Sequence, residues 1–159
     1  MLPTTSQIVM ALHGVWLIAC RKPISKVHFD VSVEGFWKSL FAAVLVLPAN
    51  MIITYLTVIR LPEVDYDLHR ATQDLLIYSV TWLLYPLLVI NVCIFLDKYE
   101  RALVYLVPYN WASVPLGYMF AAATVASGHI FNTSPLGSFL LTIVYALSLI
   151  HISEPTRPY

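Results

Sequence analysis

Three stretches of more than 20 residues carry no charged residue, and they constrain the fold more than any other feature. They cover residues 39–59, residues 75–96 and residues 102–153. As a helix, the 21 residues of the first stretch would be about 31 Å long, which matches the hydrocarbon core of a bilayer. The second stretch has 22 residues and fits equally well. Membrane-spanning helices are therefore predicted near residues 39–59 and 75–96.

The third stretch is 52 residues long, which is too much for one helix and suits two helices joined by a turn. Polar and helix-breaking residues gather at residues 127–138, and Ser134 followed by Pro135 is typical of an N-cap and a first-turn proline. Further spans are therefore predicted near residues 103–126 and 135–146. Only residues 97–101 join the second span to the third, so these two helices are expected to be antiparallel neighbours.

The composition agrees with a membrane protein. Apolar residues make up 59% of the chain and charged residues only 11%, against about 25% in soluble domains. The predicted fold class is therefore all-α, a polytopic transmembrane bundle of about four spans. The lipid bilayer is the expected partner, and a homo-oligomer or a second membrane protein stays open. The net charge is zero and no basic patch interleaves with aromatics, so no nucleic-acid partner is expected.

The N-terminal segment, residues 1–30, is expected to lie outside the bilayer core. Its apolar run, residues 8–20, is too short to span comfortably, and Arg21 and Lys22 follow it instead of preceding it as in a signal peptide. We interpret the run as a short amphipathic helix in the membrane interface or packed on the bundle. A short re-entrant span is the alternative.

Lysine and arginine are distributed unevenly between the two ends of the predicted spans. Two basic residues, Arg60 and Arg70, lie at the end between the first two spans, among several acidic residues. Cytoplasmic loops retain basic residues, so the opposite end and the N-terminus are predicted to be cytoplasmic. That end carries six basic residues: Arg21, Lys22, Lys26, Lys38, Lys98 and Arg101.

The end of the chain has an unusual sequence. Residues 147–157, LSLIHISEPTR, match the in-frame translation of a sequencing adapter over eleven consecutive positions. We therefore expect residues 147–159 to be an adapter-derived artefact, and the transmembrane domain, residues 31–146, to end in a truncated fourth span. The alternative is a genuine C-terminal tail.

The sequence contains none of the common catalytic signatures. It has no glycine-rich phosphate loop, no nucleophile elbow, no paired metal-ligand histidines and no Cys-x-x-Cys motif. No charged residue lies inside a predicted span, where it would point to a proton or ion pathway. No catalytic, cofactor-binding or metal-binding residue is therefore predicted, and the chain is not expected to be an enzyme.

Neutral polar residues within the spans are the candidate site. Asn50, Asn91 and Asn110 lie there, in helices that also contain prolines. One interpretation is hydrogen bonding that holds a helix bundle together. The other is a polar, kinked cavity at mid-membrane, as in the broken helices of transporters. Smaller polar residues share the same spans: Thr54, Thr57, Ser79, Thr81 and Ser113.

Small residues recur at four-residue spacing in the third span. Ser113, Gly117 and Ala121 would form a stripe on one helix face. Such a stripe allows another backbone to approach closely, so a helix-packing face is predicted, within the bundle or in a homo-oligomer.

Two segments resemble a known family. FDVSVEGFWKSLFAAVLVLP, residues 29–48, and YLVPYNWASV, residues 105–114, are similar to segments of an uncharacterised family of small polytopic bacterial inner-membrane proteins with Yip1-like hydropathy. The resemblance implies four or five membrane helices in the inner (cytoplasmic) membrane and no established activity. Two functional hypotheses follow: a non-enzymatic helix-packing or partner-binding membrane protein, or a subunit of a small-molecule transporter or channel.

Overall fold

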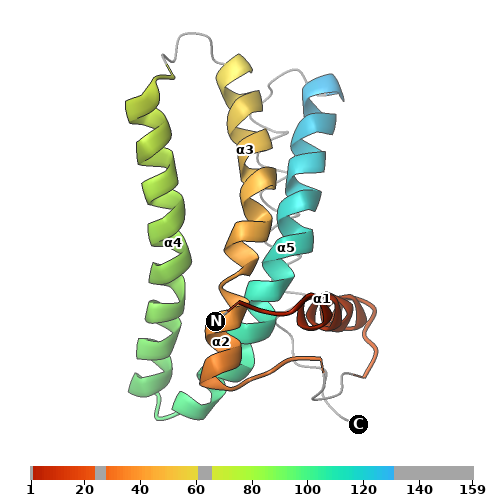
Figure 1. Cartoon of the computed structure of the whole chain (residues 1–159), viewed down its shortest axis with the longest axis vertical. Helices are drawn as coiled ribbons and strands as arrows, with labels where there is room; N and C mark the ends of the chain where they lie inside the picture. The colour runs from red at the N-terminus through yellow and green to blue at the C-terminus, as the bar shows by residue number, and fades with distance from the viewer. Residues whose placement is uncertain (1, 24–27, 61–65, 131–159) are drawn as a thin grey trace.

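The computed structural model describes residues 2–23, 28–60 and 66–130, and within these residues all regular structure is helical (Figure 1). The prediction of an all-α chain is confirmed. The span predicted near residues 135–146 and the tail at residues 147–159 lie outside the described residues. The helices are α1 (Thr5–Ala19), α2 (Val33–Ser39), α3 (Ala42–Arg60), α4 (Leu68–Phe95) and α5 (Tyr99–Ile130).

Helix α5 is the centre of the fold. The main packing contacts of α1, α2, α3 and α4 are all made with α5, and α3 and α4 have few contacts with each other. Figure 1 shows α3 beside α5 over most of its length, whereas α4 lies across α3 from α5, runs antiparallel to α5 and comes nearest to it at the end where the two helices are joined. Helices α3 and α4 are therefore both held by α5, and few contacts join them to each other.

Two helical stretches of the described chain are long and apolar enough to cross a membrane, Val33–Arg60 and Leu68–Phe95. Their most apolar windows are only 11% and 6% buried, whereas the core helix of a soluble protein is mostly buried. They contain the spans predicted near residues 39–59 and 75–96. The span predicted near residues 103–126 lies in α5, which is not among them. Unlike those two stretches, α5 supplies many of the buried residues of the described chain, including polar Asn110.

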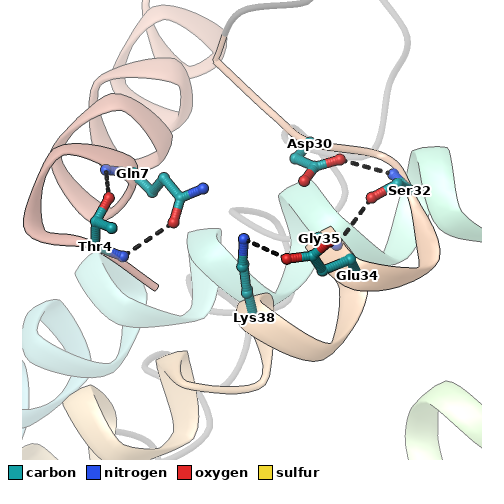
Figure 2. A network of polar contacts seen from close by, with 7 residues as sticks. All are labelled: Thr4, Gln7, Asp30, Ser32, Glu34, Gly35 and Lys38. Carbon is teal, nitrogen blue, oxygen red and sulfur yellow. Dashed lines mark hydrogen bonds and ion pairs between the residues drawn. The ribbon is translucent and has the colours of Figure 1, made fainter. Parts of the chain in front are cut away.

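Side-chain caps fix where the helices begin. Thr4 and Gln7 form a capping box at α1, with the Gln7 N–H donating to Thr4 Oγ1 at 3.3 Å (Figure 2). The hydroxyl of Ser32 starts α2 by accepting from the Gly35 N–H at 3.0 Å. Asp67 caps α4 in the same way. Each cap satisfies a backbone donor that the first turn leaves free.

Helices α1 and α4 end in the same way, at a residue in the left-handed conformation. Arg21 and Asp97 both have φ 55°. In the second case the N–H of Lys98 donates to the carbonyl of Cys93 at 2.8 Å, which closes the last turn as a Schellman motif. The chain can therefore reverse over very few residues between α4 and α5.

The buried core lies at the end of α5 that is near α1 and α2. There Phe29 and Phe36 pack with Leu106, Val107 and Trp111. Glycines allow the segments to approach closely: a Cβ added at Gly14 would lie only 2.7 Å from His28 Cβ, and one added at Gly35 would overlap the Asp30 carbonyl. This end of the molecule is therefore closely packed.

Candidate functional site

A cavity of about 670 Å³ lies between α3, α4 and α5. This volume falls within the range of about 300–1,000 Å³ that is typical of small-molecule sites. We call this cavity the cleft. Along α4 its lining residues run from Arg70 to Pro86 and do not continue toward Phe95. The cleft therefore opens toward the end of the molecule where α3 ends at Arg60 and α4 begins at Leu68, which we call the α3–α4 end. Apolar side chains form much of its wall: Val46, Ile53, Val58, Ile77 and Trp82.

Two polar side chains of α3 lie in the cleft and have no partner among the described residues. Asn50 and Thr54 are four residues apart and so share one helix face, and both line the cleft. In the described part of the chain neither side chain makes a hydrogen bond, and both are half-buried. Their amide and hydroxyl donors are therefore available to a bound molecule.

Asn110 has a different environment from Asn50. It lines the cleft but is only 1% exposed, and its Nδ2 donates to Ser39 Oγ at 2.8 Å. The Ser39 hydroxyl in turn donates to the Phe36 carbonyl at 2.7 Å. This buried chain of hydrogen bonds ties α5 to α2, so Asn110 holds the bundle together as well as lining the cleft.

Asn91 does not join the other two asparagines. It is exposed on α4, and its Nδ2 donates to the carbonyl of Leu87 in the same helix at 2.7 Å. The sequence pattern therefore placed three asparagines in one hypothetical site, whereas the structure brings only Asn50 and Asn110 to the cleft.

Tyrosines close the inner end of the cleft. Tyr85 of α4 stacks on Tyr109 of α5 with ring centroids 4.5 Å apart, and its hydroxyl lies 2.7 Å from that of Tyr105. Tyr105 and Tyr109 also stack, at 5.7 Å. Tyr85 and Tyr109 line the cleft, which the sequence does not reveal, because an aromatic side chain in an apolar helix predicts packing and only the fold shows that it faces a cavity.

Charged and phenolic groups form the mouth of the cleft. Tyr66, Arg70 and Asp74 line it, and the Tyr66 hydroxyl donates to Asp74 Oδ2 at 3.1 Å. Desolvation and this hydrogen bond both raise the pKa of Tyr66 above its ordinary value. Arg70 and Asp74 lie one helical turn apart, and within the described residues the Arg70 guanidinium makes no ion pair. The i, i+4 spacing of these two residues was visible in the sequence but points equally to a solvated surface.

Two tyrosine hydroxyls hold the turn of α3 that precedes Pro48. The Tyr78 hydroxyl of α4 donates to the Ala43 carbonyl at 2.6 Å, and the Tyr118 hydroxyl of α5 donates to the Leu45 carbonyl at 3.1 Å. A proline inside a helix removes one backbone hydrogen bond and disturbs the turn before it. Neighbouring helices therefore supply donors where α3 is weakest.

The predicted stripe of small residues packs against other parts of the same chain. A Cβ added at Gly117 would be 2.9 Å from Val46 Cγ1 of α3, and Ala121 is 3% exposed. Ser113 lines the cleft, and its hydroxyl donates to the Tyr109 carbonyl at 3.1 Å. These positions therefore face other parts of the bundle.

The part of the chain that the structure describes contains no group of three or more His, Cys, Asp or Glu side chains able to hold a metal ion. No family model, curated protein or solved structure matches this chain. The resemblance to small polytopic bacterial inner-membrane proteins with Yip1-like hydropathy thus stays a prediction.

Proposed function

We propose that this chain is a non-enzymatic integral membrane protein that binds a small amphipathic molecule in the cleft. The observation that carries the proposal is that Asn50 and Thr54 line a largely apolar cavity and, within the described residues, make no side-chain hydrogen bond. Unpartnered donors at such a position lose free energy unless a ligand or water satisfies them. A ligand with both polar and apolar parts fits this lining best.

The exposed surface supports a membrane location. Burying one large aliphatic side chain contributes about 1.5–3 kcal/mol, so a water-soluble chain would not leave a whole helix surface uncovered. Only Pro86 is buried along α4 in the described chain. The exposed apolar residues of this helix include Leu76, Ile77, Leu83, Leu84, Leu87, Leu88 and Phe95.

The orientation and location follow from charge and resemblance. The excess of basic residues at the end that carries α1 supports a cytoplasmic N-terminus, and the resemblance favours the inner membrane of a bacterium. On this proposal the mouth of the cleft, at Arg70 and Asp74, faces away from the cytoplasm.

Cysteine labelling tests whether the cleft admits water and solutes. In a Cys20→Ala, Cys93→Ala background, Thr54→Cys places a thiol in the cleft, and Ile52→Cys places one on an exposed apolar face of the same helix. A thiol in hydrocarbon does not ionise, so a charged methanethiosulfonate should modify position 54 in membranes and leave position 52 unmodified. Equal labelling at both positions, or labelling at position 52 alone, would show that the proposal is wrong.

A second candidate function is binding of a partner helix, and the extensive apolar exposure of α4 favours it. Asparagine substitutions separate the candidates. If the cleft binds a ligand, Asn50→Leu should lose ligand binding while the protein still folds and assembles in the membrane. Asn110→Leu breaks the buried bond to Ser39 and should lose this assembly. If Asn50→Leu also loses its assembly in native gels, the partner-binding function is favoured instead.

A further inference from the structure

We infer that the molecule in the cleft is a zwitterionic phospholipid whose headgroup carries a primary amine, unlike phosphatidylcholine, with this headgroup at Tyr66, Arg70 and Asp74 and one acyl chain beside Trp82. This inference rests on the proposed function and names the ligand class. The charge at the mouth, the apolar wall and the donors between them support it.

The mouth offers one group of each sign. The guanidinium of Arg70 presents donors in a fork that suits a phosphate group. Asp74, one turn further along α4, has a carboxylate that accepts from the Tyr66 hydroxyl at only one of its oxygens in the described chain. That carboxylate is suited to an ammonium group. A headgroup carrying both a phosphate and an amine, such as phosphoethanolamine, matches the pair better than a purely anionic one.

The wall beyond the mouth is apolar and is reached from the side. Ile77 and Trp82 of α4 and Ile53 of α3 line this part of the cleft. Because α3 and α4 pack on α5 and hardly on each other, an acyl chain can enter between them from the bilayer. The second acyl chain of the lipid would stay in the surrounding membrane.

Asn50 and Thr54, whose side chains make no hydrogen bond within the described residues, lie along α3 where the ester groups of a bound lipid would be. Along α3, Asn50 and Thr54 are further from the α3–α4 end than Thr57 and Val58, which also line the cleft. The ester carbonyls of a phospholipid follow its phosphate, and they accept hydrogen bonds without donating any. The Asn50 amide and the Thr54 hydroxyl can donate to them, which gives a role to two groups that line the cleft.

Quenching of Trp82 by a brominated lipid tests this inference. The full chain is placed in nanodiscs of unbrominated phosphatidylcholine, and phosphatidylethanolamine with brominated acyl chains is titrated in. Tryptophan fluorescence should fall in a saturable phase that Trp82→Phe removes. If the loss of fluorescence is unsaturable and is unchanged in Trp82→Phe, the lipid is merely part of the bulk bilayer and the inference is wrong.

Substitutions of the charged residues at the mouth test which lipid headgroup the site binds. Arg70→Gln should weaken the saturable phase about tenfold, in line with a charge-assisted hydrogen bond, while Arg101→Gln at the opposite end should leave it unchanged. Asp74→Asn should weaken binding of phosphatidylethanolamine but not of phosphatidylglycerol, and Asp97→Asn is its control. Equal effects of Asp74→Asn on both lipids would overturn the zwitterionic assignment.

Free phosphoethanolamine distinguishes a lipid from a soluble molecule with the same headgroup. If the inference holds, it should not displace the brominated lipid at equal concentration, because it lacks the acyl chain. Displacement would assign the site to a soluble solute and overturn the lipid assignment. If Thr54→Cys is labelled as expected but Trp82 is not specifically quenched, only the lipid inference fails. If Thr54→Cys is also unlabelled, the proposed function fails too.

Discussion

At the scale of single residues, Gly35 leaves less room for a side chain than Gly14 or Gly117. An added Cβ there would overlap the backbone carbonyl of Asp30, which cannot rotate away, whereas at Gly117 it would meet only the Val46 side chain at 2.9 Å. We expect Gly35→Ala to lower the free energy of unfolding by about 1–3 kcal/mol through overpacking, and Gly117→Ala by less. Thermal unfolding in detergent measures both, and equal effects would contradict the reported packing.

The same segment predicts a pH dependence. Hydrogen bonds from the side chain and then the backbone of Ser32 hold the pKa of Asp30 below its ordinary value, so the folded state favours the ionised carboxylate. This contribution to stability is present above the unfolded pKa and is lost as the pH falls through the folded pKa. Asp30→Asn should therefore lower the melting temperature at pH 7, with the difference from wild type narrowing toward pH 3. A constant difference would exclude this mechanism.

At the scale of helices, the sequence predicts most of the long elements and little of their pairing. Charge-free length locates α3 and α4, because a membrane span needs about 20 apolar residues whatever it packs against. It cannot show that α5 is the common partner of the other helices, since that depends on contacts between distant residues. For the same reason the asparagine pattern suggested one site, yet Asn91 bonds within its own helix while Asn50 faces the cleft.

The tyrosine bonds around Pro48 make a prediction at this scale. Tyr78→Phe removes the donor from α4 to the Ala43 carbonyl of α3 and keeps the aromatic ring in place. Since hydrogen bonds between membrane helices contribute about 0.6 kcal/mol on average, a loss of about 0.5–1.5 kcal/mol in unfolding free energy is expected. Tyr55→Phe, on the exposed face of α3, is the matched control. If the two variants unfold alike, the bond does not hold α4 to α3.

At the scale of the whole molecule, the fold combines a closely packed end with an open one. The buried core gathers where α1 and α2 meet α5, and the cleft lies toward the α3–α4 end. The closely packed end can hold α3 and α4 in place through their contacts with α5, while the cleft between them admits a ligand. A polar cavity was one of two interpretations of the asparagine pattern, but its place and lining could not be predicted, because they depend on how α3 and α4 each pack on α5.

Labelling of single cysteines measures how α3 and α4 are oriented in a membrane. If α3 and α4 both cross the bilayer, the exposed Cys20 beyond α1 and residue 68 at the start of α4 lie on opposite sides. Two proteins test this in bacterial spheroplasts: Cys93→Ala, which retains Cys20, and Leu68→Cys in the Cys20→Ala, Cys93→Ala background. An impermeant maleimide should label residue 68 in intact spheroplasts and Cys20 only after lysis, because the basic residues retain the N-terminal end in the cytoplasm. The reverse pattern would invert the orientation and turn the mouth of the cleft toward the cytoplasm. Labelling of both residues in intact spheroplasts would show that the two helices do not form a pair of spans.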